Sequence, residues 1–169
     1  MVGTWTKTLG RVAFINCDPL YHELDSTWNV LAAPPSWLTG HVLRRDCILA
    51  PIPAADYARH ADDLVLLPQI GIGSQGEVGS VLLFGAVPLE EMNTIALPTD
   101  SATSVALLKH LIDVRGLPMN YVSTGPDYDS MMAMADGALL IGDRALEAAR
   151  LFPDMVRMDL GTAWMEQEG

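Results

Sequence analysis

Residues 94–104, TIALPTDSATS, lead a buried strand directly into a helix. The apolar run from Thr94 to Leu97 has the composition of a strand, and Asp100 and Ser101 are residue types that cap helix N-termini. Gly116 then marks the expected end of this helix. The apolar side chains that recur between them at helical spacing are Val105, Leu108, Leu111 and Ile112. A strand joined to a helix in this way is the repeating unit of an α/β fold.

Strand-like and helix-like segments alternate along the rest of the chain. We expect further strands at residues 11–16, 47–50, 64–67, 81–84, 121–122 and 138–141. We expect further helices after Pro19, from the N-cap candidate Ser36, and at residues 54–60, 127–135 and 142–150. The alternation predicts an α/β fold with mostly parallel sheets. The run from Ser80 to Phe84 is expected to leave the sheet of the first of two lobes, which places their boundary near residues 84–93.

The composition is that of a globular protein with a substantial core. Of the 169 residues, 50% are hydrophobic and 18% are charged. The net charge of −11 argues against nucleic acid and anionic membrane surfaces as partners, because both are polyanions. The net charge does not exclude a small anionic ligand, since helix N-termini create a local positive field.

The cysteines and the N-terminal sequence indicate in which cellular compartment we expect the protein. Cys17 and Cys47 are too few for a disulfide framework and lack metal-ligand spacing, so we expect two buried thiols in a reducing compartment. No long apolar stretch follows Lys7 and Arg11, and no run approaches the roughly 20 apolar residues of a membrane helix. We therefore expect a cytoplasmic protein with neither a membrane nor a nucleic acid among its partners.

A glycine-rich segment matches the G-x-G-x-x-G pattern of dinucleotide-binding loops, as Gly71-Ile72-Gly73-Ser74-Gln75-Gly76. Such a site needs a helix directly after the glycines, so that the helix N-terminus meets the pyrophosphate. Here the residues that follow favour a strand, so we reject a nucleotide cofactor. A turn between strands explains the first two glycines, and the portion at 76–80 would let a ligand approach the backbone closely. The histidines show no metal-ligand spacing, and we expect no metal site; they are His22, His41, His60 and His110.

Three groups of polar residues are candidates for a ligand site. Asn16 ends the expected strand at 11–16, and its amide suits a hydroxyl or a carboxylate, although a turn-forming Asn before Asp-Pro is an alternative. Ser101, Thr103 and Ser104 crowd one helix N-terminus, where one hydroxyl suffices as a cap; the surplus favours an anion site, with ordinary capping as the alternative. Asp143 follows the expected strand at 138–141, and helix capping explains it equally well.

Six short motifs, taken in order, are similar to those of a known family. They are Ile15-Asn16 with Pro19-Leu20; Leu49-Ala50-Pro51-Ile52-Pro53 with Tyr57; Ile72-Gly73-Ser74 with Gly76-Glu77-Val78-Gly79-Ser80-Val81; Ser101-Ala102-Thr103-Ser104 with Leu107-Leu108; Ala138-Leu139-Leu140-Ile141-Gly142-Asp143; and Asp159-Leu160-Gly161 with Trp164. In this order they resemble the chorismate dehydratase family of the futalosine route to menaquinone. Each motif is weak by itself, and the ordered set is specific.

The resemblance implies a two-lobed fold like that of the type II periplasmic binding proteins, with the substrate held between the lobes. On this basis residues 1–90 form the first lobe, residues 91–160 form the second, and residues 161–169 begin a segment that returns to the first. Members of the family are lyases that remove water from chorismate and form 3-[(1-carboxyvinyl)oxy]benzoate. We expect this reaction to need no metal, nucleotide or other cofactor.

The resemblance also implies roles for particular residues. It implies that Asn16 and Ser80 are catalytic. It implies that the substrate is bound by Ser101, Thr103, Ser104, Gly79 and Asp143. The matched motifs hold no obvious His or Glu base, and the resemblance suggests the substrate's own carboxylate as the proton acceptor. Orientation and stabilisation of an enolate-like charge would then be the enzyme's main contributions.

The chain departs from the family pattern at its end. Family members run on past the Trp164 motif with an apolar strand and further helices, whereas this sequence stops at Gly169. We therefore expect an incomplete first lobe with an exposed sheet edge, which a second copy in a homodimer or a complementing chain would cover. The alternatives to an enzyme are a non-catalytic organic-acid-binding protein of the same fold and an inactive fragment.

Overall fold

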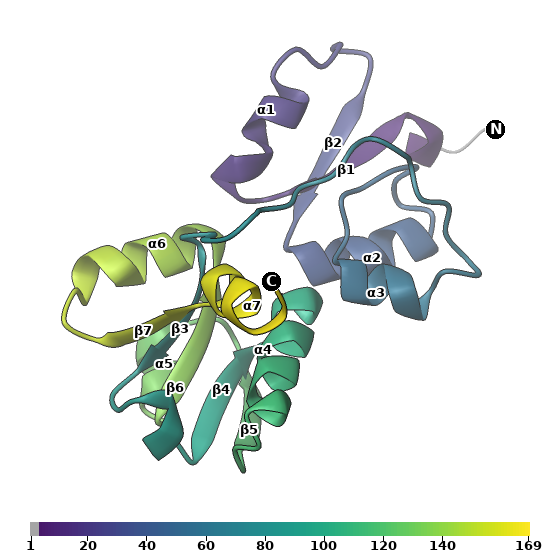
Figure 1. Ribbon diagram of the computed structural model, residues 1–169. Helices are drawn as coiled ribbons and strands as arrows, with labels where there is room; N and C mark the ends of the chain where they lie inside the picture. The colour runs from purple at the N-terminus through teal and green to yellow at the C-terminus, as the bar shows by residue number, and fades with distance from the viewer. Residues whose placement is uncertain (1–3) are drawn as a thin grey trace. The chain divides into compact units, whose positions relative to one another are not determined.

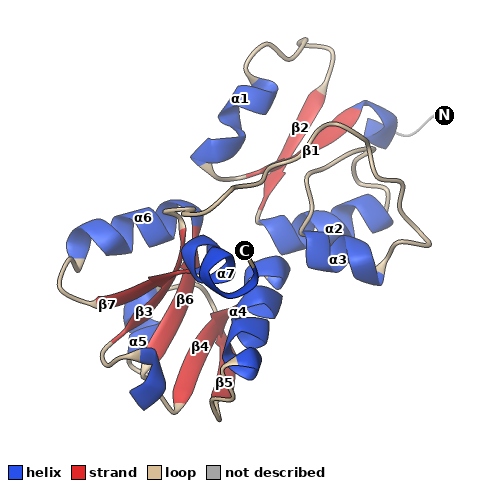
Figure 2. Ribbon diagram, in the orientation of Figure 1, coloured by secondary structure: helices blue, strands red, loops and turns tan. Residues whose placement is uncertain are grey.

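The computed structural model describes residues 4–169, and the chain forms two compact units (Figure 1). Unit 1 comprises the described residues up to Ile72 together with Asp100–Thr103, and unit 2 comprises Gly73–Thr99 with Ser104–Gly169. Both units combine helices with a sheet, which confirms a mixed α/β fold (Figure 2). No helix in residues 4–169 is both long enough and apolar enough to cross a membrane.

The sheet of unit 1 consists of two parallel strands, β1 (Thr8–Val12) and β2 (Asn29–Ala33). A third segment lies along β1, where the Gly10 N–H donates to the Leu49 carbonyl at 2.7 Å. A side chain at Gly10 would meet Ala50 Cβ at 2.5 Å, so the glycine permits this close approach. The helical segments are η1 (Thr4–Lys7), η2 (Ile15–Cys17), α1 (Asp18–Tyr21), α2 (Pro35–Leu43) and α3 (Ala54–Arg59).

The strands and helices of unit 1 enclose a small core. Its buried apolar residues are Val12, Phe14, Cys17, Ala33, Leu38 and Cys47. The expectation of two buried thiols is confirmed, since both cysteines are free and fully buried. Burial raises the pKa of both thiols, so neither is activated as a nucleophile.

The sheet of unit 2 has five strands in the order β5-β4-β6-β3-β7. Strand β4 is parallel to β5 and β6, whereas β3 is antiparallel to both of its neighbours, β6 and β7. The strands are β3 (Val81–Gly85), β4 (Thr94–Pro98), β5 (Asn120–Thr124), β6 (Gly137–Ile141) and β7 (Val156–Asp159). The helices are η3 (Leu89–Glu91), α4 (Ala102–Val114), α5 (Tyr128–Met132), α6 (Gly142–Leu151) and α7 (Leu160–Glu168).

Helices cover both faces of this sheet (Figure 2). One cluster packs Leu83 and Leu139 against α4 and α7, through residues such as Leu111 and Leu160. The other packs Phe84 and Leu140 against α5 and α6, and it includes an edge-to-face contact of Phe84 with Tyr128 at 5.6 Å. Alternate residues of a strand point to opposite faces, which explains why β6 is apolar at every position.

Several sequence predictions differ from the structure in unit 1. Strand β1 occupies residues 8–12 rather than 11–16, and β2 was not predicted. Residues 47–50 contribute only a bridge at Leu49, because the prolines at 51 and 53 lack the N–H that a longer ladder needs. The predicted strand at 64–67 is wrong: the run is a loop in which Val65 is 95% exposed. An apolar run forms a strand only where a partner strand lies beside it.

The structure also places the boundary and the end of the chain differently from the prediction. Strand β3 does not leave the sheet of unit 1; it hydrogen-bonds to β6 and β7 within unit 2, so the division falls after Ile72 rather than near residue 90. Residues 161–168 lie in α7, which buries Leu160 and Ala163, and the whole segment 161–169 belongs to unit 2 rather than to a returning segment. The sheet of unit 1 is parallel, as expected, whereas the sheet of unit 2 is mixed, because β3 runs antiparallel to β6 and β7.

Candidate functional site

Asn16 lies on an exposed turn of unit 1, four residues past the end of β1. It sits in the single-turn helix η2, where the Cys17 N–H donates to the Phe14 carbonyl at 3.1 Å. The turn is anchored on one side by buried Cys17 and on the other by the Ala13 N–H, which donates to the Ala33 carbonyl at 3.1 Å. Asn16 is therefore not the last residue of a strand, but it does follow the carboxyl ends of the parallel pair.

The segment Asp100–Thr103 belongs to unit 1; it contains the start of α4 and is hydrogen-bonded to the starts of α2 and α3. The Ser36 N–H at the start of α2 donates to the Asp100 carbonyl at 3.2 Å. In return, the Ala102 N–H at the start of α4 donates to Ser36 Oγ at 3.0 Å. The Ala55 N–H at the start of α3 donates to Thr103 Oγ1 at 3.1 Å.

These contacts change the roles expected from the sequence. The N-cap of α2 is Pro34, and Ser36 serves α4 instead of capping its own helix. The oxygen of Thr103 accepts from α3, which leaves its hydroxyl proton available as a donor. Ser101 is 5% exposed, so little of its surface is open to a ligand. The N-termini of α2 and α4 give this segment a partial positive field in a chain of net charge −11.

Four other predicted residues gather at one edge of the sheet in unit 2. The Gly142 N–H donates to the Ser80 carbonyl at 2.8 Å, because β3 and β6 are antiparallel and Val81 pairs with Ile141. Gly79 precedes Ser80, and exposed Asp143 follows Gly142 in the first turn of α6. Ser104 lies in the first turn of α4, which follows the carboxyl end of β4, and β4 runs parallel to β6. Ligands commonly bind at this edge of α/β sheets.

A fifth residue at this edge, Asp159, was not among the predicted site residues. Its carboxylate caps α7 by accepting from the Gly161 and Thr162 N–H groups at 2.9 and 3.0 Å. It also accepts from the Val78 and Gly79 N–H groups at 3.1 and 2.7 Å. An Asp ahead of a helix predicts the cap, but the bonds to a loop about 80 residues earlier leave no local signal. Partial burial raises the pKa of Asp159, but the hydrogen bonds from these backbone N–H groups lower it by more. The pKa therefore lies below its usual value.

The low pKa of Asp159 predicts a loss of stability in acid. A depressed carboxyl pKa stabilises the folded state above the usual value and ceases to do so as the pH falls through the folded value. We expect the free energy of unfolding to fall below about pH 4, and to fall less steeply for Asp159→Asn than for wild type. Urea unfolding at stepwise pH values measures both slopes. Equal slopes for the two proteins would contradict this account.

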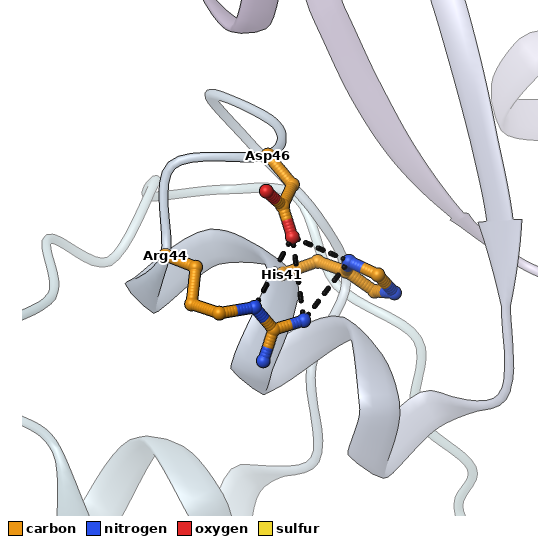
Figure 3. A network of polar contacts seen from close by, with 3 residues as sticks. All are labelled: His41, Arg44 and Asp46. Atoms are coloured by element: carbon orange, nitrogen blue, oxygen red, sulfur yellow. Dashed lines mark hydrogen bonds and ion pairs between the residues drawn. The ribbon is translucent and has the colours of Figure 1, made fainter.

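His41 and His110 each lie close to an acidic side chain. His41 Nδ1 lies 2.8 Å from Asp46 Oδ2, and Arg44 Nη2 lies 3.3 Å from the same oxygen (Figure 3). The hydrogen bond from His41 holds the pKa of Asp46 below its usual value. His110 Nε2 lies 3.4 Å from Glu168 Oε1, on the surface of unit 2. Within residues 4–169, no group of three or more metal-ligating side chains is close enough to hold an ion.

The glycine-rich segment at 71–76 is a loop that leads into β3, not into a helix. The arrangement that a dinucleotide pyrophosphate needs is therefore replaced by a loop and a strand. Gly76 and Gly79 have positive φ values of 82° and 72°, which favour glycine at both positions.

Comparison with known proteins identifies the family. A family model described as menaquinone biosynthesis matches residues 7–169. The chain belongs to this family. A curated relative from Thermus thermophilus, named chorismate dehydratase, is 37% identical over an alignment of 155 residues that covers 87% of this chain. The predicted resemblance to the chorismate dehydratase family is thereby confirmed. The chain spans 55% of the length of that relative.

Solved structures support the fold of this menaquinone-biosynthesis family member. A crystal structure of a protein from Archaeoglobus fulgidus has a TM-score of 0.66 at 19% identity and covers 95% of this chain and 62% of its own. A structure from Parabacteroides distasonis, described as an ABC transporter, has a TM-score of 0.55 at 14% identity, with coverages of 92% and 59%. At these identities the likeness concerns the fold alone.

Proposed function

We propose that the protein containing this chain removes water from chorismate, forming 3-[(1-carboxyvinyl)oxy]benzoate in the futalosine route to menaquinone. The observation that carries this proposal is the 37% identity to a relative named chorismate dehydratase, which extends over 87% of the chain. The match of residues 7–169 to the menaquinone-biosynthesis family supports the same pathway.

The reaction is an elimination that makes the ring aromatic. Chorismate loses the ring proton on the carbon that bears the enolpyruvyl ether, which is conjugated with the acid through a ring double bond. The hydroxyl on the neighbouring ring carbon then leaves as hydroxide, so that one water is released in total. Loss of the proton develops an enolate-like charge, and hydrogen-bond donors fixed in place can stabilise it. We assign this role to the Asn16 amide and the Ser80 hydroxyl, which donate hydrogen bonds and do not need to take a proton.

As the family resemblance implies, we assign substrate binding to Ser101, Thr103, Ser104, Gly79 and Asp143. The free hydroxyl proton of Thr103 and the field of the helix N-termini around it suit a carboxylate. Asp143 would repel a carboxylate, so we assign it to the hydroxyl of chorismate. The shared sheet edge of Gly79, Ser80, Ser104 and Asp143 supports this grouping.

We further propose that units 1 and 2 are the lobes of a type II periplasmic-binding-protein fold. The similarity to a solved structure described as an ABC transporter supports this assignment. Unit 1 has a sheet of only two strands, and a loop of the same unit exposes the apolar side chains of Val65, Leu66 and Ile70. Both features support a first lobe that needs a further element to cover it. A second copy or a complementing segment would supply it.

Incubation with chorismate tests the proposed reaction. The protein from the complete reading frame is mixed with chorismate, and the products are separated by liquid chromatography. We expect 3-[(1-carboxyvinyl)oxy]benzoate to accumulate, at the same rate with and without a strong chelator such as EDTA. Loss of activity on chelation, restored by added metal, would refute the metal-free reaction. Failure to consume chorismate would refute the dehydratase.

A further inference from the structure

The loop ahead of Ser80 has little to fix it from within. Residues 76–79 form no helix or strand, and Gly76 and Gly79 both have positive φ values. Glycine has the widest choice of backbone conformations, so such a loop needs contacts from elsewhere to hold one shape. Ser80 itself is held on its other side, where its carbonyl accepts from Gly142 at 2.8 Å.

Asp159 supplies the contacts that the loop lacks. Its Oδ2 accepts from the Gly79 N–H at 2.7 Å, the shortest of its four bonds. Its Oδ1 accepts from the Val78 N–H at 3.1 Å and also caps α7. The two oxygens therefore have different partners: Oδ2 accepts only from the loop, whereas Oδ1 accepts from both the loop and the helix.

The packing of Gly161 joins the same two segments independently. A Cβ at this position would meet Val78 Cγ2 at 2.6 Å and would lie closer still to the Gly76 carbonyl oxygen. The first turn of α7 thus lies directly against the loop, and only glycine permits that approach. Side-chain bonding and backbone packing both link the start of α7 to the residues ahead of Ser80.

We propose that Asp159 is a positioning residue, which fixes Val78 and Gly79 so that Ser80 is presented in one orientation. The inference rests on the proposed function, since it gives Ser80 its role. With Gly79 bound to Asp159 and the Ser80 carbonyl bound to Gly142, the backbone on both sides of the serine is fixed. Four backbone N–H groups donate to the carboxylate and stabilise its negative charge.

The replacement Asp159→Asn tests this role selectively. With its oxygen in the place of Oδ1, asparagine keeps the helix cap and the bond to Val78, because Asn is as good an N-cap as Asp. Its amide NH₂ then faces the Gly79 N–H, and two donors cannot bond. The matched control is Asp127→Asn, since Asp127 is also an N-cap aspartate of unit 2 and accepts from the Ser130 N–H of α5 at 3.0 Å.

The first readout needs no substrate. We expect the Gly79 amide proton of Asp159→Asn to move upfield in NMR spectra and to exchange at least about tenfold faster, as a lost hydrogen bond allows. The second readout is turnover by the protein from the complete reading frame. There kcat should fall on the order of ten- to a hundredfold, with KM changed less than about threefold, because misplacing a reacting group costs rate more than binding. Asp127→Asn should change neither readout.

The outcomes separate this inference from the proposed function. An unchanged Gly79 amide in Asp159→Asn, or an equal change in Asp127→Asn, would overturn the positioning role even if the wild type consumes chorismate. An altered Gly79 amide with an inactive wild type would refute the dehydratase and leave the loop contact established. Asp159→Ser keeps the cap with one oxygen and provides a second variant. If circular dichroism shows both variants unfolded, Asp159 is a structural cap and the positioning role is overturned.

Discussion

Replacing Asn16 by alanine is expected to lower the turnover of chorismate by about a hundredfold or more. The amide is proposed to donate to the charge that develops as the ring proton leaves, and removing one such donor has an effect of this order. Asn16 is exposed on the turn η2, so its truncation removes little packing. The measurement is kcat of the protein from the complete reading frame, with folding checked by circular dichroism.

The matched control for Asn16 is Asn29→Ala. Asn29 is also an exposed asparagine of unit 1, at the start of β2, and belongs to none of the matched motifs. Its replacement should leave kcat within a few-fold of wild type, as should His41→Gln. If His41→Gln were inactive while Asn16→Ala kept near-wild-type activity, the proposed role of Asn16 would be wrong. A histidine general base would then be the better account.

Replacing Gly161 by alanine is expected to destabilise unit 2 by about 1–3 kcal/mol, the usual cost of overpacking a close contact. The added methyl group would overlap the Gly76 carbonyl and lie 2.6 Å from Val78 Cγ2, so either α7 or the loop must move. Because that loop leads to Ser80, kcat should fall in the same variant. Urea unfolding measures the change in stability.

Gly125→Ala provides the control for Gly161. A Cβ at Gly125 meets nothing within 4 Å, and its φ lies outside the left-handed region. Alanine there should be neutral or stabilising by about 0.4–1 kcal/mol, through a less flexible unfolded chain. Equal stabilities of Gly161→Ala and Gly125→Ala would show that the loop and α7 do not pack as described.

The sequence predicted individual helices and strands of this fold better than it predicted which strands pair with one another. The segments around β3, β4 and β6 were recognised because an apolar run is a local property, and α4 because its cap and apolar spacing are local too. The same apolar character at 64–67 gave a strand that does not form. Pairing is a property of two segments, which explains why β3 was assigned to the wrong sheet.

The candidate site shows the same limit. Ser80 and Asp143 were each singled out by position or motif, but only the antiparallel pairing of β3 with β6 brings them to one edge. Asp159 reads locally as a helix cap, and its bond to Gly79 crosses 80 residues of sequence. Ser36 was predicted to cap its own helix, whereas its hydroxyl accepts from Ala102 of α4. Long-range hydrogen bonds of this kind leave no periodicity to detect.

Proton NMR of chorismate mixed with the protein tests the proposed dehydration most directly. We expect the non-aromatic ring protons to disappear, the four aromatic protons of a 3-substituted benzoate to appear at the same rate, and the enolpyruvyl methylene signals to remain. Release of pyruvate would contradict the account by showing a different cleavage. An unchanged chorismate spectrum with saturation transfer from the protein would also contradict it, because it would show a binding protein that holds chorismate without consuming it.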